Sequence, residues 1–324
     1  MRASRIALGT WAIGGWMWGG SDEQQSIRTL HAAIANGINV IDTAPAYGFG
    51  RSEEIVGKAI AEAAARDRVI IATKVGIEWR GGQVFRNASR RGILNEIDDS
   101  LRRLKTTYID IYQVHWPDPR VPMEETAGTM RELYEQGKIR AIGVSNFSPP
   151  QMEEFRRSAP LHTEQPPYNL FEREIDRDVL PYAREHNIST LVYGSLCRGL
   201  LSGRITKDTK FTGDDLRKLD PKFQEPRFSQ YLRAISELDA FAKKNYGKRV
   251  MDLGVRWALD QPGVTIALWG ARRPDQVADV GKIDGWSLDA SAREEIERIV
   301  NGAVKEPVGP EFMAPPARPA SAAA

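Results

Sequence analysis

The sequence predicts one α/β domain: a (β/α)8 barrel with long loops at the C-terminal face of its strands. Short apolar runs alternate with longer amphipathic stretches along 324 residues, an ordinary length for this fold. No GxGxxG turn follows any run, so a Rossmann nucleotide-binding domain is not expected. We expect strands to begin near Ile6, Asn39, Val69, Ile109, Ile139, His162, Ser189 and Val264.

The amphipathic stretches have helical spacing. One of them places apolar residues on a single helix face, at Ile93, Leu94, Ile97, Leu101 and Leu104. Charged residues occupy the opposite face, at Asp98, Asp99, Arg102 and Arg103. Three later stretches predict helices over residues 227–246, 248–260 and 291–302.

A glycine-containing segment after the second apolar run resembles a phosphate-binding loop only weakly. Six residues separate Gly50 from Gly57, and no hydroxyl residue follows Lys58. The P-loop pattern has a shorter spacing and a Ser or Thr after its lysine. Ser52 is instead predicted to be the N-cap of a helix, with acidic residues in the first turn.

The overall composition excludes several classes of partner. With 45 basic and 43 acidic residues the net charge is +2, which gives no footprint for nucleic acid. No apolar run reaches membrane-spanning length, and Gly9 and Thr10 come too early for a signal peptide. The single Cys197 fits a reducing compartment, so we expect a soluble, cytoplasmic protein.

Aromatic and basic residues gather in two segments expected at the barrel mouth. Trp16 and Trp18 lie in a glycine-rich loop after the first strand. They could cover the barrel end or form a substrate wall. Residues 77–86 predict a hairpin with a Gly-Gly turn that carries Trp79, Arg80 and Arg86. Exposed arginines are usually solvated, and the alternative is that they grip an anionic substrate.

The last third of the chain carries a long loop and a tail. Residues 195–226 form a polar insertion that we expect to close over a cofactor as part of one domain, residues 1–304. Arg272, Arg273 and Pro274 predict a helix N-terminus that attracts an anion. Residues 305–324, rich in Pro and Ala, are expected to form a partly flexible tail.

Four polar residues near predicted strand ends form a coherent acid set: Asp42, Tyr47, Lys74 and His115. A free tyrosine has a pKa of about 10, and a neighbouring ammonium is expected to lower it. A carboxylate would hold the lysine in place, and a histidine could orient a carbonyl and share a hydrogen bond with the phenol. Each residue alone is more often structural, but all four at one rim indicate catalysis. No cluster has metal spacing, so no metal is expected.

The ordered motifs resemble those of the aldo-keto reductase family, in its bacterial branch with a tyrosine at the end of the seventh strand. The similarity covers nearly everything between residues 5 and 283. It rests on Leu8-Gly9-Thr10-Trp11, Asp42-Thr43-Ala44-Pro45-Ala46-Tyr47-Gly48, Thr73-Lys74, His115-Trp116, Gly143-Val144-Ser145-Asn146-Phe147, Gln165, Tyr193 and Gly270-Ala271-Arg272.

The resemblance implies an NAD(P)H-dependent carbonyl reductase with Tyr47 as general acid, Lys74 and Asp42 as its tuning pair and His115 as the orienting residue. We expect a preference for NADPH, because of Arg272 and Arg273. The expected cofactor-binding residues are Gly9, Thr10, Trp11, Asp42, Ser145, Asn146, Gln165, Tyr193, Gly194, Ser195, Leu196, Cys197, Gly199, Leu201, Gly203, Gly270, Arg272 and Gln276. One departure concerns the adenine end, where Asp279-Val280 replaces a Glu-Asn pair of many members.

Two rival functions remain open on the sequence. A barrel lyase could use Lys74 as a Schiff-base nucleophile, but this leaves Asn146, Gln165 and Tyr193 unexplained. A non-enzymatic NADPH-binding regulatory subunit could share the fold, although we would expect it to carry an extra N-terminal segment. For the enzyme we expect a small polar aldehyde or ketone as substrate. Aromatic contacts to it are expected from Trp16, Trp18, Trp79 and Trp116. An anion or sugar hydroxyls could be bound by Arg80, Arg86 and Arg120.

Overall fold

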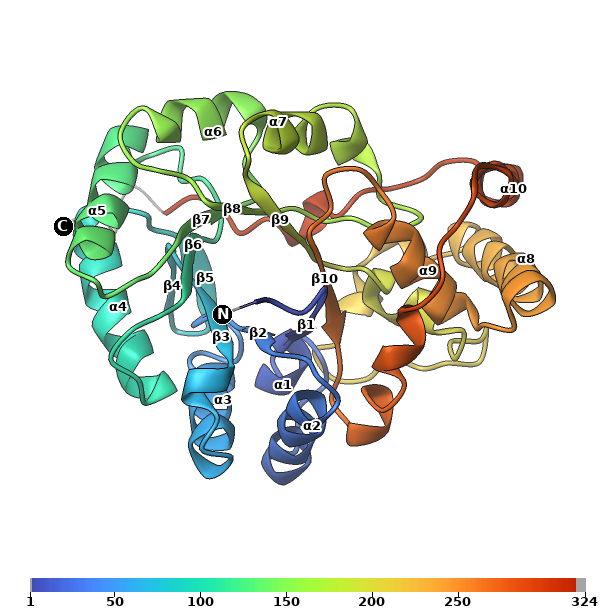
Figure 1. The fold of residues 1–324 in the computed structure, drawn as a ribbon, viewed down its shortest axis with the longest axis horizontal. Coiled ribbons are helices and arrows are strands. Elements are labelled where there is room, and N and C mark those ends of the chain that lie inside the picture. Colours follow the sequence, from blue (N-terminus) through green and yellow to red (C-terminus); the bar gives the residue numbers. More distant parts are fainter. Residues whose placement is uncertain (1, 319–324) are drawn as a thin grey trace.

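The computed structural model describes residues 2–318 and confirms the barrel (Figure 1). Within that range eight parallel strands close in the order β1-β10-β9-β8-β7-β6-β3-β2. Each predicted run forms one strand, and the largest offset, from Ile139 to Ile142, is three residues. The strands are β1 Ile6–Gly9, β2 Val40–Asp42, β3 Ile70–Val75, β6 Ile111–Val114, β7 Ile142–Ser145, β8 Thr163–Gln165, β9 Ser189–Val192 and β10 Ile266–Gly270.

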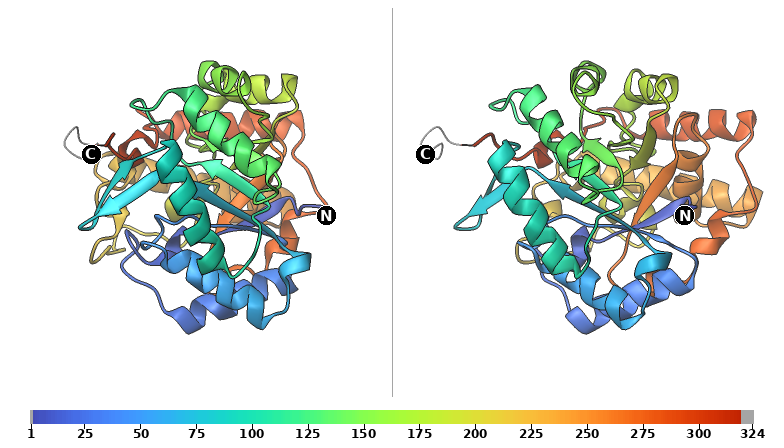
Figure 2. Two further views of the ribbon diagram at one scale, coloured as in Figure 1. Left: turned by 90° about the vertical axis from the view of Figure 1, so that its left-hand side faces the viewer. Right: turned by 60° about the vertical axis from the view of Figure 1, so that its left-hand side comes forward.

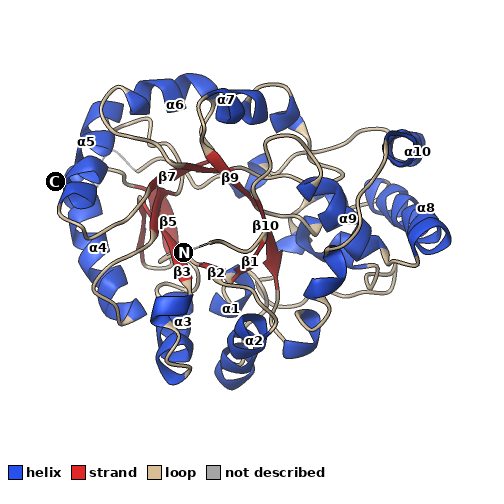
Figure 3. Cartoon of the chain, viewed as in Figure 1, coloured by secondary structure: helices blue, strands red, loops and turns tan. Residues whose placement is uncertain are grey.

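Helices surround the strands on the outside of the barrel, as Figure 3 shows in blue around red. They are α1 Trp11–Gly14, α2 Glu23–Ala35, α3 Arg51–Glu62, α4 Arg90–Leu104, α5 Met123–Glu135, α6 Pro149–Arg156, α7 Val179–Glu185, α8 Arg227–Tyr246, α9 Val250–Leu259 and α10 Ala290–Ala303. The three late helices agree with their predicted ranges within two residues. None of the helices in residues 2–318 combines the length and apolar character needed to cross a bilayer.

Helix α4 packs its predicted apolar face against the barrel, but one charged residue differs from the prediction. Ile93, Ile97 and Leu104 are buried in the main core. Arg103, expected on the solvent face, is also buried, and its Nε lies 2.6 Å from a carboxylate oxygen of Glu53. The long aliphatic stem lets the guanidinium reach across to α3, where a buried carboxylate requires a cation.

The prediction that Ser52 caps α3 is wrong. The helix begins at Arg51, and the residue before it is Gly50 with φ 97°, a turn that glycine adopts without strain. The Ser52 hydroxyl is buried instead and contacts the hydroxyls of Thr10 and Thr43 at 2.8 and 2.9 Å. It therefore ties together the segments that follow β1 and β2, directly behind the barrel mouth.

The predicted hairpin forms from β4 Ile77–Arg80 and β5 Gln83–Arg86. The C-terminal tail runs beside it, since the Arg86 amide donates to the Pro316 carbonyl at 2.9 Å. The Arg86 Nε donates to the Pro315 carbonyl at 2.8 Å. Figure 2 shows hairpin and tail at the end of the barrel opposite the N-terminus. The predicted flexible end of the tail, residues 319–324, lies outside the described residues.

The barrel interior changes character along its axis. Because strand side chains alternate between faces, every second residue points inward. Deep inside, Ala7, Val40, Leu191, Ile266 and Leu268 form an apolar cluster. At the C-terminal ends the paired positions become polar, with Lys74 beside Gln113 and Ser145 beside Gln165. The strands therefore deliver their polar side chains to the end of the barrel where catalytic residues of this fold gather.

Candidate active site

A cavity of about 590 Å³ opens at the C-terminal ends of the strands. Its wall includes most of the residues predicted for catalysis, cofactor and substrate. These are Gly9, Thr10, Trp11, Trp16, Trp18, Asp42, Tyr47, His115, Trp116, Ser145, Asn146, Gln165, Tyr193, Gly194, Ser195, Leu196, Gly199, Gly270, Arg272 and Gln276.

Lys74 lies at the centre of a short hydrogen-bonded network behind this wall. Its Nζ donates to Asp42 Oδ1 at 2.7 Å, to the Thr43 carbonyl at 3.0 Å and to Tyr47 Oη at 3.2 Å. The second Asp42 oxygen accepts from Gln165 Nε2 at 2.7 Å. An ammonium has three N–H donors, and all three are used here. The network therefore holds the phenol oxygen at a fixed point on the cavity wall.

Burial gives this network its electrostatic character. Lys74 and Asp42 are almost fully buried. Desolvation lowers the pKa of Lys74, and the charge of Asp42 and its hydrogen bond oppose that effect. Removing either charge would leave the other buried and uncompensated, which costs about 3–5 kcal/mol in typical proteins. Each of the two buried charges therefore depends on the other for its stability.

The pKa of Tyr47 differs from our expectation. Burial raises the pKa of Tyr47 well above its ordinary value, and the nearby Asp42 carboxylate raises it further, so the net effect is not the lowering expected from Lys74. The phenol consequently stays protonated across the neutral range. Because the contact from Lys74 uses the phenol oxygen as acceptor, the phenol keeps its own hydrogen for another acceptor.

His115 lies beside Tyr47 without bonding to it among the described contacts. The two rings are edge-on, with centroids 5.8 Å apart, rather than sharing the hydrogen bond we expected. Burial lowers the pKa of His115 well below its ordinary value, and the charge of Lys74 adds to this effect. The imidazole is therefore neutral at neutral pH and can offer one N–H to a carbonyl oxygen.

An amide-rich wall faces this acid group across the barrel. Asn146 Nδ2 donates to the His115 carbonyl at 3.1 Å, and its Oδ1 accepts from the Tyr193 hydroxyl at 2.9 Å. Ser145 Oγ donates to the Gln165 carbonyl at 2.7 Å. Asn146 has φ 63°, a left-handed conformation that asparagine tolerates better than most residues. The strand ends thus hold a fixed set of amide donors and acceptors beside an aromatic ring.

Arginines define the outer part of the cavity. Five of them each form an ion pair with a carboxylate: Arg198, Arg204, Arg217, Arg249 and Arg273. Among the described residues of this wall, Arg272 is the arginine that has no such pair. Its Nη1 donates to the Trp18 carbonyl at 2.9 Å. Arg272 is therefore the cation best able to take a new anionic partner.

We expected free backbone amides at this helix N-terminus, but the amides of Arg272 and Arg273 already have hydrogen-bond partners. Both donate to the side-chain oxygen of Gln276, at 2.8 and 3.0 Å. Pro274 does begin a helix, but only a three-residue 3-10 turn. Attraction of an anion at this end therefore depends on the guanidinium groups rather than on free backbone N–H groups.

The 195–226 loop closes against the glycine-rich loop after β1. Both oxygens of Asp214 accept backbone N–H bonds, from Met17 at 2.7 Å and Gly19 at 3.0 Å. The Leu216 amide donates to the Met17 carbonyl at 3.0 Å. Sequence analysis missed Asp214, because an exposed aspartate in a polar loop gives no signal that distinguishes it from its neighbours.

Several predicted residues lie away from the cavity wall. Cys197, Leu201 and Gly203 belong to the 195–226 loop but are absent from the lining set. Trp79 packs against Phe49 with ring centroids 5.8 Å apart. Burial raises the pKa of the Cys197 thiol to about 12, so it is not a reactive thiolate.

The three arginines considered for an anionic substrate also lie away from the lining. Arg80 pairs with Glu78 at 2.9 Å near the hairpin tip. Arg86 donates to carbonyls of Pro315 and Pro117, so it fastens the tail. The cavity lining includes instead apolar groups such as Ile77, Val84 and Met313.

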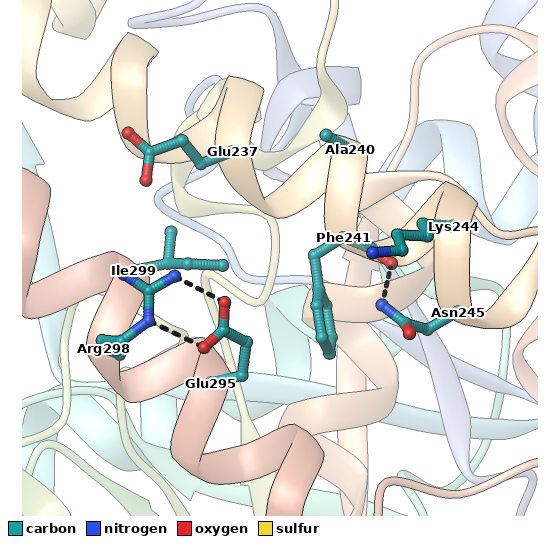
Figure 4. A pocket seen from close by; sticks show the side chains of 8 residues that line it. All are labelled: Glu237, Ala240, Phe241, Lys244, Asn245, Glu295, Arg298 and Ile299. Atoms are coloured by element: carbon teal, nitrogen blue, oxygen red, sulfur yellow. Dashed lines mark hydrogen bonds and ion pairs between the residues drawn. The ribbon is translucent and has the colours of Figure 1, made fainter.

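A second hollow, of about 470 Å³, lies on the outer surface between α8 and α10 (Figure 4). Its sides include Phe241 and Ile299, and the Arg298–Glu295 ion pair lies along it. It contains none of the predicted site residues. Residues 2–318 also hold no group of three or more His, Cys, Asp and Glu side chains arranged for a metal ion.

The comparisons with known proteins agree with this geometry. A model described as the aldo/keto reductase family matches residues 5–301. The chain belongs to the aldo/keto reductase family. It is therefore an oxidoreductase, and its barrel with polar strand ends is the architecture of that family.

Individual relatives cover nearly the whole chain. An aldo-keto reductase of Bacillus subtilis (strain 168) is 62% identical over 318 residues, which are 98% of this chain and 96% of the relative. The NADH-specific methylglyoxal reductase of Escherichia coli (strain K12) is 37% identical, covering 85% of this chain and 88% of the relative.

Solved structures show the same correspondence. The glycerol dehydrogenase of Gluconobacter oxydans superposes with a TM-score of 0.88 at 53% identity, over 97% of this chain and 96% of its own. An aldo-keto reductase of Klebsiella pneumoniae, solved in complex with NADPH, superposes with a TM-score of 0.70 at 29% identity, over 92% and 91%.

Proposed function

We propose that this aldo/keto reductase reduces the carbonyl group of small aldehydes and ketones with NADPH, and that Tyr47 is the general acid. The observation that carries the proposal is the Lys74 network, which fixes a protonated phenol on the wall of the cavity. A proton donor within reach of a bound carbonyl oxygen is what carbonyl reduction requires.

The residues of the cavity fit NADPH. Ser145, Asn146 and Gln165 would hold the nicotinamide amide, with Tyr193 against the ring. Gly194, Ser195, Leu196 and Gly199 would hold the diphosphate, and Arg272 the 2′-phosphate. All of these line one continuous cavity, and Arg272 is free of carboxylate partners within the described chain. When bound, NADPH would supply a hydride to the carbonyl carbon.

The protein's part in the reaction follows from the geometry. As negative charge develops on the carbonyl oxygen, Tyr47 donates its proton to that oxygen. The neutral His115 ring orients the carbonyl by donating an N–H bond. Lys74, held by Asp42, stabilises the phenolate that remains on Tyr47, because its N–H bond to the phenol oxygen strengthens as that oxygen becomes charged.

The wall near Tyr47 favours neutral substrates of modest size. Neither Arg80 nor Arg86 lines the cavity: Arg80 pairs with Glu78, and the Arg86 guanidinium, 5.4 Å from the Trp116 ring, donates to the Pro315 carbonyl. We therefore propose small, uncharged aldehydes and ketones, sugar-derived ones included. The buried, unpaired Cys197 supports a cytoplasmic location.

A Schiff-base lyase is not proposed, because it would need Lys74 as a free amine, whereas its three N–H groups are engaged. The decisive experiment is an NADPH-consumption screen of the purified protein across aldehydes, aldoses and ketones. We expect turnover of small neutral aldehydes. The absence of NADPH consumption with every carbonyl compound would refute the proposal.

A further inference from the structure

A second group of buried charges lies outside the catalytic network. Glu172, Asp220 and Lys222 are fully buried, and Arg198 is 7% exposed. We call these four residues the buried charge cluster. Two anions and two cations make it electrically neutral, and the catalytic step described above uses none of them.

The contacts within the buried charge cluster are close. Arg198 donates through Nη2 to Glu172 and through Nε to Asp220. Lys222 Nζ lies 2.8 Å from the Glu172 carboxylate. Burial would raise the pKa of Glu172, but the charges of Arg198 and Lys222 outweigh it and lower that pKa. The carboxylate is therefore ionised, and each cation depends on it.

The cluster controls the backbone that lines the cofactor end of the cavity. Cys197, Arg198 and Gly199 have φ values of 46°, 52° and 94° in succession. For the first two, this left-handed conformation is unfavourable and persists only when surrounding contacts impose it. The Arg198 guanidinium forms two ion pairs inside the cluster, and we attribute to these the turn that brings Gly199 to the wall.

A further pair of contacts links the cluster to Gly194, three residues before this turn begins. Glu172 Oε2 accepts from Asn169 Nδ2 at 2.6 Å, and the same Nδ2 donates to the Gly194 carbonyl at 3.0 Å. The cluster thus holds both ends of the segment 194–199, the segment proposed to bind the diphosphate.

The cluster also contacts the C-terminal tail. Lys222 Nζ donates to the Gly309 carbonyl at 3.2 Å. The Arg198 guanidinium lies 5.7 Å from the ring of Phe312, and Phe312 and the following residues line the cavity. The same four charges therefore connect the cofactor segment with the tail that borders the substrate.

We infer that Glu172 and Arg198 are positioning residues for the cofactor: the buried charge cluster presets the segment 194–199 for the diphosphate and couples it to the closure of the tail. This inference rests on the proposed function for the identity of the cofactor. The coupling to the tail does not depend on it.

The test compares Glu172→Gln with Asp110→Asn. Asp110 also accepts from arginine, with Arg66 Nη2 at 2.8 Å, but it precedes β6 at the other end of the barrel. Fluorescence titration with NADPH measures the Kd, and steady-state assays with saturating NADPH measure kcat. We expect the Kd of Glu172→Gln to rise about tenfold or more while kcat changes less than about threefold. Asp110→Asn loses stability without this shift in Kd.

Trypsin provides the readout for the tail. Lys305 is exposed, and cleavage after it releases the residues from 306 onward, which mass spectrometry detects. We expect faster cleavage in Glu172→Gln than in Asp110→Asn or the wild type. Glu172→Asp, which keeps the charge, should recover part of both effects. If Glu172→Gln does not fold, Arg198→Lys serves instead, because a lysine keeps the charge but lacks the separate Nε and Nη2 donors that the guanidinium gives to Asp220 and Glu172.

The outcomes distinguish a failure of the proposed function from a failure of the inference about the buried charge cluster. Wild-type protein that neither binds NADPH nor consumes it overturns the proposed function. Wild-type protein that binds NADPH, with a Glu172→Gln variant of unchanged Kd and unchanged tail cleavage, overturns the inference alone.

Discussion

The inner and outer ends of the cavity use polar contacts in opposite ways. At the inner end, Asp42, Lys74, Ser145 and Gln165 belong to strands and bond to one another inside the barrel. At the outer end, Asp214 and Arg272 belong to loops and bond to the backbone of the loop after β1. The inner contacts are buried and fixed, whereas Asp214 is exposed and can exchange its bonds with water. Under the proposed function, the difference predicts that chemistry depends on the inner end and cofactor retention on the outer end.

The sharpest test of this division is Tyr47→Phe. Removing the hydroxyl removes the proton donor, so kcat should fall by about 10²–10⁴-fold. The Kd for NADPH should stay within about twofold, because the outer contacts are untouched. Rapid-quench assays and fluorescence titration measure the two quantities. Retained turnover would show that another group supplies the proton.

Arg272→Ala should affect binding instead. Loss of a charge-assisted contact to phosphate typically costs about 1.5–3 kcal/mol, so the KM for NADPH should rise about 10- to 100-fold. The KM for NADH should change little. Arg273→Ala is the matched control, since Arg273 is already paired with Asp275 at 3.0 Å. Equal effects of the two variants would contradict the assignment of the 2′-phosphate to Arg272.

Asp214→Ala should have a smaller effect on the outer end. It removes two hydrogen bonds that close the 195–226 loop, each with a net value of about 1 kcal/mol or less at an exposed site. We expect NADPH to dissociate about fivefold faster in stopped-flow displacement, with unchanged single-turnover chemistry. Asp208→Ala, in an exposed position of the same loop, serves as control. A slower chemical step in Asp214→Ala would argue against the division.

The last expected effect is on stability rather than on binding or catalysis, and it concerns a carboxyl behind β3. Glu96 accepts from the Gly76 amide at 3.2 Å, and burial raises its pKa to about 8. Because the folded state holds this proton more tightly than the unfolded state, its contribution to stability is complete at low pH and is lost as pH rises to about 8. The free energy of unfolding should fall by at most about 1.4 kcal/mol per pH unit over this range.

Urea denaturation at pH 5 and pH 8 measures this effect. Glu96→Gln should lose less stability than the wild type over that interval. Glu62→Gln, at an exposed position of α3, should behave as the wild type. A wild-type protein whose stability rises over the interval in parallel with Glu96→Gln would show that Glu96 is ionised in the folded state.

The sequence predicted the inner end far better than the outer end. Strand ends are visible as apolar runs that stop at Asp42 or at His115, and parallel strands bring their ends to one face. The barrel order and the position of Tyr47 beside Lys74 therefore followed from pattern and resemblance. The contacts of Asp214 and Arg272 could not be predicted, because they join loops far apart in the chain through backbone atoms, which carry no residue-type signal.

Errors at the inner end had a different cause. Three predictions were wrong: the cap role of Ser52, the solvent-facing position of Arg103 and the lowered pKa of Tyr47. Each of these properties depends on burial, which the local sequence does not report. A serine before two glutamates is typical of a helix N-cap, yet the chain turns at Gly50 and buries the hydroxyl. A phenol beside an ammonium is expected to be acidic, yet desolvation outweighs that contact.

The pairing of Arg86 with Ala317 has a consequence for how this protein can change. Part of the cavity border comes from a hairpin and a tail, both added to the outside of the closed barrel. Mutations, insertions or exchanges in these two segments can reshape the opening while the eight strands and their polar ends remain intact. Under the proposed function, selectivity for new compounds can therefore evolve, or be engineered, independently of the residues proposed to move the proton.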